Sequence, residues 1–207
     1  MAETHFSQLL IATFNAGKVR EFASLLVTLS LRLHSLDEFP AIREVAETGA
    51  TFAENAILKA EGYARQTQLW TLADDSGLEV QALDGAPGVL SARYAGPQAT
   101  DAERIALLLD ELAKTNDEQR RARFICNIAV ADPDGQVLKL VEGICEGHLA
   151  RAPRGTNGFG YDPVFIPEGY QQTFGELPVE VKKSVSHRAR ALAAASTFLQ
   201  GLVESRA

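Results

Sequence analysis

The sequence has few cysteines, no long apolar run and no excess of basic residues. Its 207 residues include only two cysteines, Cys126 and Cys145, which are far apart and outside any CxxC arrangement. Nothing there suggests a zinc site or a disulfide framework. The net charge of −7 argues against a grip on duplex nucleic acid, which needs a broad basic surface, so no nucleic-acid partner is expected. A small anionic ligand held by a few local cations remains compatible with this charge.

The same absences predict where the protein resides. No stretch reaches the roughly 18 uninterrupted apolar residues of a membrane span, so no membrane partner is expected. The opening "MAETHFSQLL" has neither the basic region nor the long apolar region of a signal peptide. We therefore expect a soluble cytoplasmic protein whose two thiols are buried and reduced.

Short apolar runs alternate with amphipathic segments in the first half of the chain. A hairpin with its turn at "DPDG" follows over residues 122–150, and Ser186 begins a last helix. This order is typical of an α/β fold with a mixed sheet, with two lobes around a cleft. We expect strands at residues 9–13, 31–36 and 70–73, and helices from about residue 18, after Thr51 and over residues 100–114.

The stretch "IATFNAGKVREF" has the character of a phosphate-binding turn. A buried strand leads through a tight turn with Gly17 into a helix that carries Lys18 at its mouth. The N–H groups of a helix start attract an anion, and Thr13 and Asn15 could donate further hydrogen bonds. The pattern GxxxxGK[ST] is absent, so this is not a Walker A loop. The alternative is an ordinary strand–turn–helix connection with a solvated lysine.

Two neighbouring carboxylates follow a buried strand in "LADDSGLEV". A Mg²⁺ ion needs only one or two carboxylates when substrate phosphates complete its shell, and Asp74 or Asp75 could supply one. Neighbouring side chains of a strand face opposite ways, so we expect one of the pair to face the cation and the other to brace the turn. Glu47 is a plausible second ligand. The alternative is a surface turn, because Asp, Ser and Gly favour turns.

Two later segments could recognise a base. In "GTNGFGYDP", the glycines allow close approach to a ligand, and Phe159 or Tyr161 could stack on a flat ring. In "KKSVSHRARAL", His187 and Arg188 stand at a helix start, where cations are unfavourable unless an anion or a carbonyl acceptor arrives. The alternatives are a flexible loop with an aromatic anchor in the core, and a solvated basic cluster.

In combination and order, these segments resemble the inosine triphosphate pyrophosphatase family, also called Ham1 or RdgB-like. The resemblance runs from about residue 8 to residue 200. It implies an elongated mixed sheet with two lobes flanking a nucleotide-binding cleft, one domain over residues 1–207, and a homodimer. It also implies Mg²⁺-dependent hydrolysis of ITP, dITP and XTP to the monophosphate and pyrophosphate. The motifs are "TFNAGKVREF", "ETGATFAENAILKA", "ADDSGLEV", "GAPGVLSARYAG", "GTNGFGYDPVF" and "SHRARAL".

The resemblance also implies roles for single residues. Asp75 corresponds to the general base, which also binds the metal, and Glu47 corresponds to the other acidic ligand. A water activated by Asp75 would attack the α-phosphorus, and Lys18 with Mg²⁺ would cover the charge of the leaving pyrophosphate. The implied substrate contacts are Thr13, Phe14, Asn15, Ala16, Gly17, Lys18, Ser76, Phe159, Gly160, Tyr161, Asp162, Lys182, His187 and Arg188.

The sequence departs from the family pattern at four positions. Phe14 stands in the middle of a motif that is usually TGN or SxN, and Asn157 replaces a common glycine. Val181 replaces a frequent acid, and Lys183 stands where a small polar residue is expected. The last two changes leave open whether Lys182 or Lys183 contacts the substrate.

Two other functions compete with this one. A Maf-like pyrophosphatase acting on modified pyrimidine triphosphates has a similar nucleotide cleft, but Lys18 after Asn15 and the late "SHR" favour the purine family. A nucleotide-binding module without catalysis is the other alternative, and Phe14 is the feature that supports it. Pyrophosphate release from different nucleotides separates all three.

Overall fold

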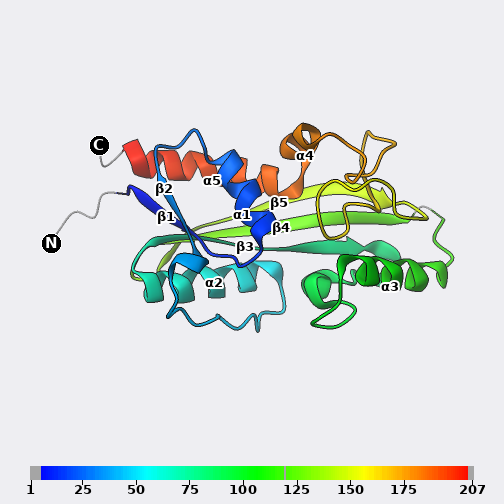
Figure 1. The fold of residues 1–207 in the computed structure, drawn as a ribbon, viewed down its shortest axis with the longest axis horizontal. Coiled ribbons are helices and arrows are strands. Elements are labelled where there is room, and N and C mark those ends of the chain that lie inside the picture. The colour runs from blue at the N-terminus through cyan, green and yellow to red at the C-terminus, as the bar shows by residue number, and fades with distance from the viewer. Residues whose placement is uncertain (1–5, 119, 205–207) are drawn as a thin grey trace. The chain divides into compact units, whose positions relative to one another are not determined.

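The computed structural model describes residues 6–118 and 120–204 (Figure 1). The first five residues of the stretch inspected for a signal peptide therefore lie outside the described part. Contacts divide the chain into two compact units. Unit 1 holds the chain through Asp75, the segment Cys126–Gly143 and the chain from Arg190 on, and unit 2 holds Ser76–Ile125 and Ile144–Ala189. The prediction of one domain with two lobes flanking a cleft stays a prediction.

The described residues form one mixed sheet of six strands in the order β2-β1-β3-β4-β5-β6. Strand β1 pairs in parallel with β2 and β3, whereas β5 and β6 are antiparallel. The predicted α/β fold with a mixed sheet is confirmed. The strands are β1 Gln8–Ile11, β2 Arg32–Ser35, β3 Trp70–Val80, β4 Arg121–Ala131, β5 Val137–Leu149 and β6 Phe165–Pro167, and the helices are α1 Ala16–Leu25, α2 Phe52–Thr67, α3 Asp101–Ala113, α4 Val179–Val185 and α5 His187–Glu204.

In unit 1 the sheet is covered on both faces. Helices α1 and α5 lie on one side of the strands and α2 lies on the other (Figure 1). Leu9 and Ile11 pack in a cluster with residues of α1 and α5, and Leu10 packs in a second cluster with residues of α2. Successive side chains of a strand point to opposite faces, so the continuous apolar run of β1 serves both clusters. The two layers hold the end of β1 and the starts of α1 and α2 in fixed positions.

The helix starts follow the capping signals in the sequence. The Thr51 hydroxyl accepts from the Glu54 N–H at 3.2 Å, but the Glu54 carboxylate reaches past Thr51 to the Ala50 N–H, at 2.7 Å. Thr100 begins α3 with a complete capping box, in which its own N–H donates to Glu103 at 2.7 Å. Both helix starts are confirmed, because a cap depends only on residues close in sequence.

Unit 2 has its own apolar core, which covers one face of its strands. The α3 residues Ile105 and Leu108 pack there with Leu78 and Val80 of β3, and Glu79 between them faces the other way. Aromatic rings also pack in this core, where the Phe124 and Phe165 ring centroids lie 4.5 Å apart. The alternation of β3 therefore leaves a polar face in unit 2.

One expectation about local structure is wrong, and one helix was not predicted. The segment "DDSG" is not a turn, because β3 runs without interruption from Trp70 to Val80 and both aspartates are buried. The turn preference of Asp, Ser and Gly is overridden by burial and by the cations described below. Helix α4 was not expected, since its seven residues carry few periodic apolar positions.

No helix among residues 6–118 and 120–204 combines the length and the apolar character needed to cross a membrane. Cys126 and Cys145 are both buried, and neither takes part in a disulfide in the described chain.

Candidate active site

The predicted phosphate loop lies in unit 1 between β1 and α1. Asn15 is the N-cap of α1, and its Oδ1 accepts from the N–H groups of Gly17 and Lys18 at 2.8 and 3.2 Å. Its own backbone N–H donates to the Thr13 hydroxyl at 3.2 Å. Asn15 Oδ1 thus holds the helix start that follows at Ala16, and the prediction that Asn15 donates to a phosphate stays a prediction. The loop is therefore a preformed turn.

Phe14, the unusual residue of this loop, lies against α2. Its side chain is 52% exposed, and its ring makes an edge-on contact with the ring of Tyr63, with centroids 6.4 Å apart and planes at 80°. The bulky side chain therefore has an aromatic partner of its own in unit 1.

The neighbouring carboxylates of β3 have different partners. Asp74 Oδ2 forms an ion pair with the Lys18 ammonium at 2.9 Å. Asp75 Oδ1 lies 3.5 Å from the Lys59 ammonium, and its Oδ2 accepts from the Asn55 amide at 3.1 Å. This separation follows from the alternation of side chains along a strand. Each carboxylate therefore meets a different lysine.

Lys59 of α2 brings the two predicted metal ligands together. Its ammonium donates to Glu47 Oε1 at 2.7 Å and lies 3.5 Å from Asp75 Oδ1. The sequence reasoning missed Lys59, although a signal was present. The residue lies on the same face of the expected helix as Ala56 and Tyr63, and a lysine on an apolar face implies buried carboxylates.

The charges of this cluster do not cancel. Burial raises the pKa of the Asp75 carboxyl, although Lys59 and Lys18 oppose the shift. Burial alone would lower the pKa of Lys59, but the carboxylates of Asp75, Asp74 and Glu47 outweigh it and raise that pKa. Three carboxylates thus face two ammonium groups, and the excess negative charge suits a further cation.

This cluster fits a magnesium ion that shares substrate phosphates. In the described part of the chain, no group of three or more His, Cys, Asp and Glu side chains is arranged to hold a metal by itself. Mg²⁺ does not require such a cage, because it keeps several waters and takes one or two carboxylates plus phosphate oxygens. Glu47 and Asp75 reach the same ammonium group from separate segments, so they are close enough to serve one ion.

A second cluster, in unit 2, surrounds the Phe159 ring. Asp162 Oδ2 accepts from the Lys182 ammonium at 2.6 Å and from the Phe159 N–H at 2.8 Å. The Lys182 ammonium lies 4.5 Å from the centre of the Phe159 ring, and the Arg188 guanidinium lies 5.6 Å from it. Cations over a ring are attracted by its negative face. The ring thus lies beside two cations, one of which is paired with Asp162.

Burial and a close glycine distinguish the Asp162–Lys182 pair from the neighbouring Lys183–Glu180 pair. Lys182 is buried, whereas Lys183 is partly exposed and pairs with Glu180 at 3.1 Å. Gly158 has φ +78°, and a Cβ built on it would lie 1.9 Å from Asp162 Oδ2. A side chain at Gly158 would displace the carboxylate, so the position requires glycine.

His187 and Arg188 are the first residues of α5 and are both buried. The alternative of a solvated basic cluster is therefore wrong. Arg188 Nη2 donates to the Ser76 hydroxyl at 3.1 Å, and the His187 ring stacks on Phe124 with centroids 4.7 Å apart and planes at 13°. The helix start thus places both side chains inside unit 2.

The two rings of the glycine-rich loop have different surroundings. Tyr161 packs in the apolar core of unit 2, and its hydroxyl donates to the Ser91 carbonyl at 3.0 Å. Phe159 is only partly buried, and Lys182 and Arg188 lie over its ring. Gly160 between them donates its N–H to Asp101 Oδ2 at 2.7 Å. Tyr161 is therefore the aromatic anchor, and Phe159 is the ring better placed to meet a base.

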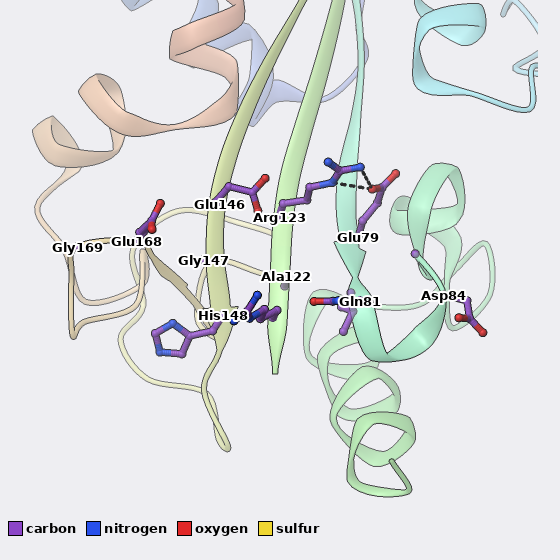
Figure 2. A pocket seen from close by; sticks show the side chains of 13 residues that line it. Glu79, Gln81, Asp84, Ala122, Arg123, Glu146, Gly147, His148, Glu168 and Gly169 are labelled. Atoms are coloured by element: carbon purple, nitrogen blue, oxygen red, sulfur yellow. Dashed lines mark hydrogen bonds and ion pairs between the residues drawn. The ribbon is translucent and has the colours of Figure 1, made fainter. Parts of the chain in front are cut away.

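A cavity of about 1110 Å³ lies elsewhere in unit 2, on the polar face of its strands. Figure 2 shows Arg123 and Glu79 side by side in this cavity, joined at 2.9 Å, with Glu146 and His148 nearby. The predicted site residues are all described, and none of them lines this cavity. Its charges are mixed in sign, so no single ligand class is indicated.

Comparison with known proteins gives one consistent result. Residues 9–198 match the model of the Ham1 family. The chain is 54% identical over 185 residues to a dITP/XTP pyrophosphatase of Geobacillus kaustophilus (strain HTA426), covering 89% of this chain and 90% of the relative. A protein of the same name from Nostoc sp. (strain PCC 7120) is 48% identical over 199 residues, covering 96% and 97%.

Solved structures agree with the sequence comparison. A HAM1 protein from Coxiella burnetii superposes with a TM-score of 0.86 at 45% identity, covering 94% of this chain and 98% of that one. The Staphylococcus aureus Ham1 protein gives a TM-score of 0.83 at 40% identity, covering 94% and 99%.

Proposed function

Since the chain belongs to the Ham1 family, we propose that it hydrolyses the non-canonical purine triphosphates dITP, ITP and XTP to the monophosphate and pyrophosphate. Removing deaminated purines from the nucleotide pool keeps them out of DNA and RNA. The observation that carries the proposal is the meeting of Glu47 and Asp75 at Lys59, close to a lysine-bearing helix start. That arrangement suits a metal–polyphosphate complex better than a lone anion.

The unit 1 cluster would bind the phosphates. Glu47 and Asp75 would hold Mg²⁺, which when bound neutralises charge on the phosphate oxygens. Lys18 binds the leaving pyrophosphate, after exchanging its contact with Asp74 for one with phosphate. Asp75 orients a water toward the α-phosphorus and takes its proton. The bond from the water oxygen to the α-phosphorus forms as the bond between the α-phosphorus and the α–β bridging oxygen breaks, and pyrophosphate leaves with that oxygen.

The unit 2 cluster would select the base. Hypoxanthine and xanthine present a 6-oxo acceptor, whereas adenine presents a 6-amino donor. The donor groups of Lys182 and Arg188 beside the Phe159 ring favour the acceptor, and Phe159 provides a ring on which a purine can stack. Burial of Lys182 and its contact with Asp162 support Lys182 over Lys183 as the substrate contact. His187 and Ser76 complete the set of donors.

One assay tests the proposal against its two competitors. Pyrophosphate release is measured with ITP, dITP, XTP, GTP, ATP, dTTP and UTP, with and without Mg²⁺. We expect ITP and XTP to exceed ATP in kcat/KM by about 10⁴, the discrimination available to a site that pairs a polar edge. Equal rates on ATP and ITP would refute the selection argument. Preference for dTTP or UTP would indicate the Maf-like reaction, and binding without pyrophosphate release would indicate a module without catalysis.

Three finer features belong to the same proposal. We propose Mg²⁺ as the cation, a homodimer as the assembly and the cytoplasm as the location. The homodimer rests on the family resemblance and the cation on the carboxylate geometry of unit 1. Light scattering after size exclusion measures the assembly, and restoration of activity by Mg²⁺ after chelation tests the cation.

A further inference from the structure

Helix α2 carries a buried asparagine that contacts both segments of the unit 1 cluster. Asn55 is 0% exposed. Its Oδ1 accepts from the Gly49 N–H at 2.8 Å, and its Nδ2 donates to Asp75 Oδ2 at 3.1 Å. One end of the carboxamide must accept and the other must donate, so these two partners fix its orientation.

The segment that Asn55 holds is the one that carries Glu47. Gly49 follows Glu47 by two residues, and it lies very close to α2. A Cβ built on Gly49 would lie 2.6 Å from the Glu54 Cβ and 2.8 Å from Asn55 Oδ1. The approach of this backbone to the helix is therefore closer than any larger residue allows. Asn55 bonds it at Gly49, and Glu54 bonds it at Ala50.

Asn55 and Lys59 are one helical turn apart, and both contact the unit 1 cluster, Lys59 with a charge and Asn55 without one. Residues four apart lie on the same face of a helix, so both side chains reach the same place. Lys59 contacts the oxygens of Glu47 and Asp75 with a positive charge, which a bound cation would oppose. Asn55 is neutral, so its two hydrogen bonds can persist when a cation is present.

We propose that Asn55 is a positioning residue that sets the separation of the Glu47 segment and Asp75, so that their carboxylates meet at one divalent cation. The inference rests on the proposed function, because it takes these two residues as the cation ligands. Asn55 does not touch the substrate in this scheme. It acts on the reaction through the backbone at Gly49 and through Asp75.

The variants Asn55→Leu and Asn55→Ser test the proposal. Leucine has a similar size but forms neither hydrogen bond, and serine is too short to reach both partners. Asn127 offers a matched control, since it is also buried in unit 1 at 6% exposure and donates its amide to a carboxylate, Glu142, at 3.4 Å. Asn127→Leu and Asn127→Ser thus remove the same kind of bond outside the cluster.

Two measurements separate positioning from a purely structural role. Mn²⁺ binding without nucleotide is followed by electron paramagnetic resonance on the folded protein, and the half-saturating Mg²⁺ concentration is taken from pyrophosphate release with ITP. Loss of a residue that orients metal ligands typically weakens metal binding by about 10- to 100-fold. We expect that loss for both Asn55 variants, with kcat for ITP falling more than KM rises, and changes within about twofold for the Asn127 variants.

Each outcome decides the matter. A thermal melt of each variant first shows whether it is folded, and metal binding is measured on folded protein. If Asn55→Leu does not fold, Asn55→Ser provides the comparison. A lower melting temperature with wild-type Mn²⁺ affinity and wild-type Mg²⁺ dependence would overturn the inference, because Asn55 would then only stabilise the fold. Absence of pyrophosphate release by the wild-type protein would instead refute the proposed function, while the Mn²⁺ measurement would still report on Asn55.

Discussion

The two candidate clusters use the same kind of ion pair with opposite charge balance. In unit 1, Glu47, Asp74 and Asp75 face Lys18 and Lys59, so negative charge is in excess. In unit 2, Asp162 pairs with Lys182, and Arg188 joins Lys182 over the Phe159 ring, so one carboxylate and two cations meet in this cluster. A lysine bonded to a carboxylate is therefore not informative by itself. The count of the surrounding charges decides which ligand a cluster attracts.

The surroundings of each lysine reinforce this difference. Lys59 lies among carboxylates, and their charges raise its pKa against the effect of burial. Lys182 pairs with one carboxylate, Asp162, and also lies over the Phe159 ring, whose face attracts a cation without adding a formal charge. The first arrangement favours a divalent ion and the phosphates that follow it. The second arrangement favours a neutral ligand that presents a carbonyl oxygen.

The largest effect should come from neutralising Asp75. Asp75→Asn keeps the shape but removes a charge and a base, so we expect kcat for ITP to fall by a factor on the order of 10² or more. Lys183→Met, on a partly exposed lysine, serves as a control with wild-type rates. Steady-state pyrophosphate release measures both. Near-normal turnover by Asp75→Asn would remove this residue from the mechanism. The unit 1 cluster would then have no assigned general base.

A smaller effect should follow from removing charge in unit 2. Lys182→Met removes the cation that pairs with Asp162. We expect the ITP-to-ATP ratio of kcat/KM to fall about tenfold, because the variant loses one hydrogen bond from a charged group to the base. The rate of the chemical step should change less than the ratio does. Competition between the two nucleotides in one reaction gives the ratio directly. An unchanged ratio would show that Lys182 does not read the base.

The smallest effect concerns stability and compares the two units through their helix caps. Thr51 caps α2 in unit 1, and Thr100 caps α3 in unit 2. Replacing either threonine with alanine should lower the free energy of unfolding by about 1 kcal/mol. Urea denaturation of both variants provides the measurement. A change in only one of them would mean that the other helix start contributes nothing to the stability of its unit.

The features that could be predicted from the sequence depend on residues close together in the chain. The caps at Thr51 and Thr100 were predictable, since each hydrogen bond joins residues three apart. The strand and helix around the phosphate loop were also predictable, because β1 is a continuous apolar run and α1 follows a cap. The family resemblance then indicated which polar residues to consider.

The contacts that assemble the clusters could not be predicted in the same way. Lys59 and Asp75 are 16 residues apart, and Arg188 and Ser76 are 112 apart, so no local pattern reports either contact. Local preference was misleading for "DDSG", where turn-forming residues continue a strand. Asp74 and Asp75 remain extended there because each has a lysine that compensates its burial.

The continuity of β3 limits how the chain can change in length. Asp75 and Ser76 are consecutive residues of this strand, yet one contributes to unit 1 and the other to unit 2. Inserting or deleting a single residue between them would reverse the facing of the rest of β3 and turn Glu79 toward the core, where Leu78 and Val80 now pack. Viable length variants of this strand should therefore differ by two residues, or absorb an odd one in a bulge.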